Sequence, residues 1–181
     1  MKYKVLPVQS KQDIPEIYRD NPVGLLLEYH NLARPFDEYE KACLLVGMCM
    51  DNRKSINVPP NFAYIMRVAG ADLRGSEFNI SYAVSIAGIR HIALICHDLC
   101  GMSGLDAKKE AFIEGLVNGA GWTRENAERH FDSMAPKREI GDEVDFVLSE
   151  AARLKEMYPK IEVAPLCYRL EDNRLYCVLP E

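Results

Sequence analysis

The sequence lacks a long hydrophobic run, a basic stripe and an export signal, and each absence excludes a class of protein. No apolar stretch approaches the ~20 residues of a membrane span, so we expect no membrane partner. The net charge is −5 and no polybasic stripe is present, which argues against nucleic acid as a partner. Residues 1–5 have no signal-peptide character, so we expect a cytoplasmic protein with reduced thiols.

Internal repeats and low-complexity tracts are also missing. The chain has 181 residues, of which 48% are hydrophobic and 27% charged, and these values are ordinary for a globular protein. A chain of this length can bury a sizeable core. We therefore expect one domain over residues 1–181, made of a helical arm (1–40) and an α/β core (41–181).

Short apolar runs alternate with helical patterns along the core. The expected strands are residues 42–48, 63–68, 91–96, 161–168 and 175–179. The expected helices are residues 76–87, 106–134 and 139–158. This alternation predicts an α/β fold with a central, mostly parallel sheet of about four strands, flanked by helices. The last connection is too short for a crossover, so the final strand should be an antiparallel edge strand.

Three details of the helices can be tested against a structure. Residues 22–39 carry an apolar stripe that must be buried either on their own domain or on a second subunit. In the helix at 76–87, the spacing favours an inward face of Phe78, Tyr82 and Ile86, with Val84 as a further candidate. Pro136 should separate the two later helices.

Three possible metal ligands follow two of the predicted strands. Cys49 comes at the end of the first, and His97 and Cys100 follow the third. Because parallel strands end at the same edge of a sheet, neighbouring first and third strands would bring these residues together. Two thiolates and one imidazole are the ligands of a tetrahedral zinc site whose fourth position stays open. The sequence therefore predicts a Zn²⁺ site.

Asp51 and Arg53 lie two and four residues after the first ligand. The Arg53 guanidinium could bind Asp51 in a fork and keep it ionised, and Asp51 could then orient a water at the open position. Two alternatives remain open. Asp51 could itself bind zinc and close a structural site, or the two residues could form a surface ion pair that contributes ~0–1 kcal/mol.

The other cysteines need no role as ligands. Cys43, Cys167 and Cys177 lie in or beside apolar strands, where a free cysteine behaves as a small buried hydrophobe. Cys96 directly precedes His97, and the sequence alone does not assign it.

These residues resemble the sequence pattern of the β-class carbonic anhydrases. The family's Cys-x-Asp-Ser-Arg corresponds to CMDNR at 49–53, and its Gly-His-x-x-Cys-Gly corresponds to CHDLCG at 96–101. Between them, the family's Arg-Asn-Ala-Gly-Asn corresponds to RVAGA at 67–71. The similarity extends over residues 42–104, and more faintly over the C-terminal helix and strands.

The resemblance implies Cys49, His97 and Cys100 as zinc ligands and Asp51 with Arg53 as a catalytic dyad. Water or hydroxide would be the fourth ligand. Zinc-bound hydroxide would attack carbon dioxide, and bicarbonate would leave. Because members of the family are built on dimers that often pair into tetramers, the resemblance also implies a homodimer or a dimer of dimers.

Several positions depart from the family pattern. Asn52 replaces serine, Val68 and Ala71 replace two asparagines, and Cys96 replaces glycine. The loss of the two asparagines makes the expected pocket more apolar. Such a pocket would suit a hydrolase of carbonyl sulfide or carbon disulfide, and enzymes of both kinds resemble this family. A third hypothesis is a non-catalytic family member, with Asp51 on the zinc, that binds bicarbonate or has a structural role.

Overall fold

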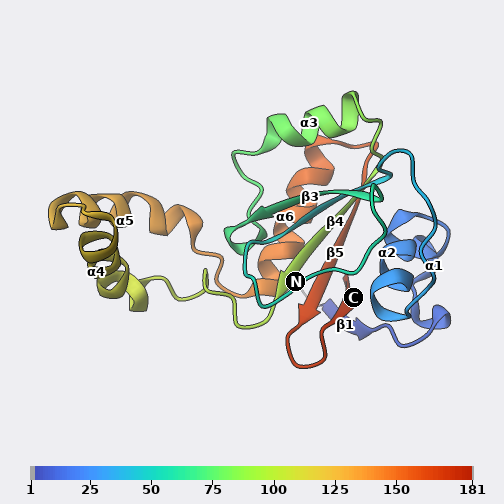
Figure 1. The fold of residues 1–181 in the computed structure, drawn as a ribbon, viewed down its shortest axis with the longest axis horizontal. Helices are drawn as coiled ribbons and strands as arrows, with labels where there is room; N and C mark the ends of the chain where they lie inside the picture. The colour runs from blue at the N-terminus through green and yellow to red at the C-terminus, as the bar shows by residue number, and fades with distance from the viewer. Residues whose placement is uncertain (1–2, 181) are drawn as a thin grey trace.

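A six-stranded mixed sheet forms the centre of the computed structural model, which describes residues 3–180 (Figure 1). Its strands lie in the order β1-β6-β5-β4-β2-β3. The strand bounds are β1 Tyr3–Pro7, β2 Leu44–Cys49, β3 Ala63–Val68, β4 His91–His97, β5 Glu162–Arg169 and β6 Arg174–Pro180. The four strands β3, β2, β4 and β5 are parallel, whereas β6 pairs antiparallel with β5 and β1 antiparallel with β6. The predicted α/β class and mostly parallel sheet are confirmed.

The first strand of the sheet was not predicted, because residues 1–40 read as polar and helix-prone. Residues 3–7 instead form β1, which extends the sheet beyond β6 and places Val5 opposite Val178. The last strand is therefore antiparallel, as predicted, but β1 takes the edge position. Pairing between the two ends of the chain stabilises β1, and no local pattern encodes such pairing.

The N-terminal helices pack on one face of this same sheet. They comprise a 3-10 turn η1 Lys11–Asp13, α1 Glu16–Arg19 and α2 Pro22–Asn31. Asn21 caps α2, with its side-chain oxygen accepting from Val23 N at 2.8 Å. Leu26 and Leu27 are fully buried in one cluster with Val46 of β2 and Ile95 of β4. Of the two alternatives for the arm, the structure shows packing on its own sheet.

The opposite face is covered by α6 Glu143–Met157, with α3 Glu77–Ser85 near the β3 end of the sheet (Figure 1). Val147 and Leu154 of α6 pack against β4 and β5 residues in a second cluster. The predicted inward face of α3 is wrong, because its buried residues are Ile80 and Ala83. The three residues expected inside are exposed: Phe78 by 82%, Tyr82 by 55% and Ile86 by 70%. The helix carries apolar residues on two faces, and spacing alone could not tell which face meets the sheet.

Two helices form a hairpin that projects from the sheet (Figure 1). They are α4 Lys109–Ala120, which follows a 3-10 turn η3 Asp106–Lys108, and α5 Arg124–Arg138. Thr123 caps α5 by accepting from Asn126 N at 3.3 Å. Pro136 does not end this helix as predicted but lies inside its last turn. In the described range, 3–180, no helix is long and apolar enough to cross a membrane.

Candidate metal centre

The three predicted metal ligands lie at one edge of the sheet, where two neighbouring parallel strands end. Cys49 is the last residue of β2, and His97 is the last residue of β4. The two strands pair directly, with Met48 opposite Ile95. Cys100 returns to the same place through a tight turn in which Leu99 adopts a left-handed φ of 54°. The strand ends thus place all three side chains together, as the sequence predicted.

Their ligand atoms form a compact, buried cluster. One sulfur or nitrogen atom from each residue lies within 4.8 Å of the others. Cys49, His97 and Cys100 are 4%, 1% and 5% exposed. The two Sγ atoms are 4.0 Å apart. Two sulfurs bound to one tetrahedral zinc at ~2.3 Å would be separated by roughly 3.8 Å, so the cluster has the dimensions of a zinc site.

His97 has a buried nitrogen that a metal would satisfy. Its Nδ1 lies 2.8 Å from Asp98 O, and this contact fixes the ring in the tautomer with the proton on Nδ1. The other ring nitrogen, Nε2, is buried and has no hydrogen-bond partner among the described residues. A buried polar atom without a partner is costly. The donors present therefore fit a metal such as zinc.

One of the two thiols, that of Cys49, is biased toward the thiolate form. A hydrogen bond from Cys100 holds the pKa of Cys49 well below its usual value, and the same contact raises the pKa of Cys100. Gly70 N also donates to Cys49 Sγ, at 3.3 Å. Gly70 has a φ of +67°, and a Cβ there would lie 2.9 Å from Ile140 Cγ2, so glycine is required for this approach.

Asp51 and Arg53 form a bidentate ion pair beside the cluster. Arg53 Nη2 lies 2.6 Å from Asp51 Oδ2, and Arg53 Nε lies 3.1 Å from both carboxylate oxygens. These hydrogen bonds hold the pKa of Asp51 far below its usual range. Asp51 Oδ2 is 3.8 Å from His97 Nε2, so the ionised carboxylate faces the place where a metal would lie.

Two further cationic side chains lie at this site, and neither could be assigned a role from the sequence. Lys54 Nζ donates to Cys49 O at 3.2 Å, and Lys54 is only 2% exposed. Arg67 Nη2 donates to the carbonyl oxygens of Asp51 and Lys54, at 3.0 and 2.8 Å. Residues 52–61 contain no helix or strand, and nothing in the sequence of such a loop indicates that one of its lysines is buried.

Of the positions that depart from the family pattern, Asn52 is exposed and the other three are buried or half-buried. Ala71 is 2% exposed and has a φ of 58°, and Val68 is half-buried. Cys96 is buried and lies in register with Cys167 on the neighbouring strand. Apolar contacts to the two cysteine ligands come from Ile140, Met102 and Phe146.

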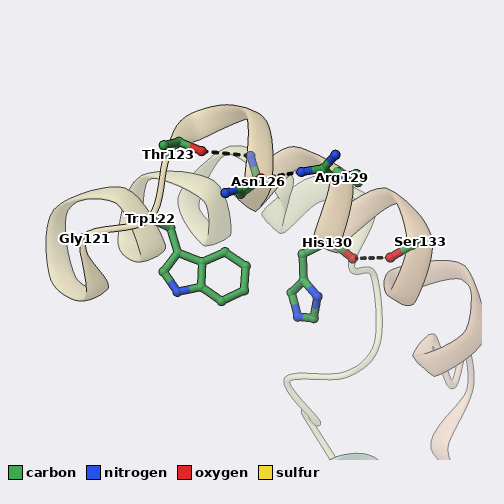
Figure 2. Close-up of a pocket in the computed structure, with 7 residues that line it drawn as sticks. All are labelled: Gly121, Trp122, Thr123, Asn126, Arg129, His130 and Ser133. Atoms are coloured by element: carbon green, nitrogen blue, oxygen red, sulfur yellow. Dashed lines mark hydrogen bonds between the residues drawn. The ribbon is translucent and has the colours of Figure 1, made fainter.

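Two pockets lie in or beside the hairpin. One of about 580 Å³, at the α4–α5 turn, is lined by Trp122, Asn126 and His130 among others and contains none of the predicted site residues (Figure 2). A second pocket, of about 380 Å³, is mostly apolar. Its lining includes Gly101 and Met102, which directly follow Cys100 in the chain.

The similarity of this chain to known proteins lies in its fold. No family model and no curated protein matches the sequence. Solved structures do match. A β-carbonic anhydrase from Trichomonas vaginalis is 16% identical with a TM-score of 0.64, over 87% of this chain and 94% of that one. This chain has the fold of the β-carbonic anhydrases.

Two more solved structures are similar to this chain in fold. A carbonic anhydrase from Glaciozyma antarctica is 22% identical with a TM-score of 0.61, over 76% of this chain and 83% of that one. A carbon disulfide hydrolase is 21% identical with a TM-score of 0.54, over 75% and 77%. The resemblance noted in the sequence is thus confirmed at the level of the fold.

Proposed function

We propose that this protein is a zinc-dependent carbonic anhydrase of the β class, which interconverts carbon dioxide and bicarbonate. The observation that carries the proposal is the unpartnered, buried Nε2 of His97. It faces two buried cysteines and lies 3.8 Å from a carboxylate oxygen that Arg53 holds ionised. The fold supports the same assignment.

Each residue has a distinct task in this proposal. Cys49, His97 and Cys100 would hold the zinc, which when bound supplies a Lewis acid that lowers the pKa of water. Asp51 accepts a proton or a hydrogen bond at Oδ2 and so orients the reacting water. Arg53 donates to both Asp51 oxygens, keeps the carboxylate ionised and would keep it from coordinating the metal.

The test is stopped-flow hydration of carbon dioxide by the zinc-loaded protein, with the Cys49→Ser variant as the blank. Turnover well above the blank is expected. If zinc is bound and no turnover is measured, the carbonic anhydrase proposal is wrong.

A hydrolase of carbon disulfide or carbonyl sulfide is the second candidate. The observation in its favour is the apolar packing of Ile140 and Met102 against the two cysteines. The nearby sequence agrees, since Val68 and Ala71 stand where the family pattern has asparagines. Release of hydrogen sulfide from either substrate, measured beside carbon dioxide hydration on one zinc-loaded sample, separates the two activities.

A non-catalytic member of the family is the third candidate. It requires Asp51 to leave Arg53 and bind the metal. Metal-edge X-ray absorption on the zinc-loaded protein distinguishes the two states, since a closed site has an Asp51 oxygen at ~2.0–2.2 Å from zinc.

We also propose that the chain is one domain, acts in the cytoplasm and forms a homodimer or a dimer of dimers. A reducing compartment keeps Cys49 and Cys100 available as ligands.

For the subunit contact, β3 is an edge strand of the sheet, and its Tyr64 and Ile65 are each 46% exposed. The exposed apolar residues of α3 add to this surface, and a second copy of the chain would bury both.

A further inference from the structure

A fully buried lysine, Lys54, contacts the backbone of the candidate metal centre. The Lys54 side chain is enclosed in the loop after β2, and its Nζ donates to the carbonyl oxygen of the ligand Cys49. None of the ion pairs found in residues 3–180 involves Lys54. A buried ammonium group without a paired carboxylate costs stability, so its presence calls for a compensating negative charge.

The Lys54 ammonium group contacts a residue of the metal centre, since Nζ lies 3.2 Å from Cys49 O. Cys49 and Cys100, whose Sγ atoms are 4.0 Å apart, would each carry a negative charge as thiolate ligands. Asp51 already has a partner in Arg53. The unbalanced negative charge is therefore that of the ligands and of whatever they hold.

The charge count shows when Lys54 is needed. A divalent metal with two thiolates and one neutral imidazole has no net charge. An anion at the open fourth position leaves the group with one negative charge in a buried site, and Lys54 supplies one positive charge to offset it. Arg67 donates to backbone carbonyls at the edge of the site and is exposed, so water screens its charge more strongly.

We propose that Lys54 is the fixed counter-charge of the metal centre and raises the affinity of the metal's open position for small anions. The inference rests on the proposed function only in that Cys49, His97 and Cys100 hold a metal. Lys54 is a positioning residue. Its positive charge acts on the bound anion at a distance, and its Nζ contacts only the backbone carbonyl of the ligand Cys49.

The experiment is titration of the cobalt-loaded protein with azide, followed by the visible absorption of cobalt. The Lys54→Met variant keeps most of the side-chain volume and removes the charge. We expect it to bind cobalt and to bind azide about tenfold more weakly, which corresponds to ~1.4 kcal/mol. Lys54→Arg should retain most of the wild-type affinity.

Three controls separate this effect from a structural one. Lys155→Met removes an exposed lysine of α6 and should leave azide binding unchanged. The metal-free Lys54→Met protein should be at least as resistant to heat as the wild type, because a buried charge has been removed. The affinity ratio of wild type to Lys54→Met should persist at high salt, since buried charges are poorly screened.

The outcomes are decisive for the two proposals separately. If cobalt-loaded Lys54→Met, or Lys54→Gln should the first variant not fold, binds azide as tightly as wild type, the role of Lys54 is excluded. A ratio that disappears at high salt also excludes it. If the wild type itself binds no cobalt through Cys49, His97 and Cys100, both this inference and the proposed function are wrong.

Discussion

Arg53 connects the two halves of the metal centre through a single nitrogen atom. Its Nη2 donates to Asp51 Oδ2 at 2.6 Å and to Leu99 O at 2.9 Å. Asp51 belongs to the loop after β2, whereas Leu99 belongs to the turn between two of the proposed ligands. The dyad therefore also fixes the turn that brings Cys100 back to Cys49.

The Asp51→Asn substitution tests the carboxylate. The variant keeps the side-chain volume, so zinc content should be unchanged, whereas kcat/KM for carbon dioxide should fall about a hundredfold or more because the proton acceptor is lost. Stopped-flow kinetics together with metal analysis measures both quantities. Asp98→Asn is the matched control, since the Asp98 carboxylate binds Leu170 N instead. Full turnover in Asp51→Asn would remove Asp51 from the proposed dyad.

Leu99 is held in a backbone conformation that disfavours it. It has a φ of 54° and is 75% exposed, so little packing is lost on truncation. A left-handed conformation costs a non-glycine residue roughly 1–2 kcal/mol, part of which glycine loses again as chain entropy. We expect Leu99→Gly to raise the free energy of unfolding by about 0.5–1 kcal/mol in urea titrations. Met50→Gly, at an exposed position with an ordinary φ, should instead lower it.

Among the elements, α3 combines a buried face with an exposed apolar one. Phe78, Tyr82 and Ile86 are spaced by four residues, so they form one outward stripe, while Ile80 and Ala83 pack inward. Exposed apolar stripes of this length mark contact surfaces. Helix α3 lies near strand β3 (Figure 1), and its buried residues pack in one cluster with Met66 and Val68 of that strand. A second copy is proposed to bind at this end of the sheet.

We expect the wild-type protein to sediment as a dimer or tetramer at micromolar concentration. The double substitution Phe78→Lys and Ile86→Lys places two charges in the stripe and should shift the protein to monomer without changing its circular dichroism. Phe112→Lys changes an exposed aromatic residue on α4 and serves as the control. Wild-type-like sedimentation of the double variant would place the subunit contact elsewhere.

For the whole molecule, one buried carboxylate joins the projecting hairpin to the body. Asp72, which is 4% exposed, accepts hydrogen bonds from Arg74 Nε at 2.6 Å and from Arg138 Nη1 at 2.7 Å. Arg138 is the last residue of α5. Burial alone would raise the pKa of Asp72, but the hydrogen bonds from Arg74 and Arg138 outweigh it and hold the pKa below its usual value.

This pKa shift sets the direction of a pH effect. A carboxyl group whose pKa is lower in the folded state stabilises the protein above its unfolded pKa, and the contribution disappears as the pH falls through the folded value. Asp72→Asn should therefore lower the free energy of unfolding by about 2 kcal/mol at pH 7. The difference from wild type should shrink below pH ~4, where urea titrations of both proteins can be compared. A difference that stays constant with pH would assign the loss to packing.

The sequence by itself determined the α/β class, the parallel strands and the residues at their ends. Short apolar runs specify buried strands, and a buried strand ends where polar residues begin, so the positions of Cys49 and His97 relative to the sheet edge could be inferred. Asp51 and Arg53 are two residues apart, and their contact follows from that short separation.

Only the tertiary structure decided which of several allowed surfaces is buried. The face of α3 that packs inward, the pairing of β1 with β6 and the burial of Lys54 all depend on residues far away in the chain. A helix with apolar residues on two sides, a five-residue strand and a lysine in a loop each have more than one acceptable local state. Contacts between residues far apart in the chain decide among these local states, and those contacts exist only in the folded sheet.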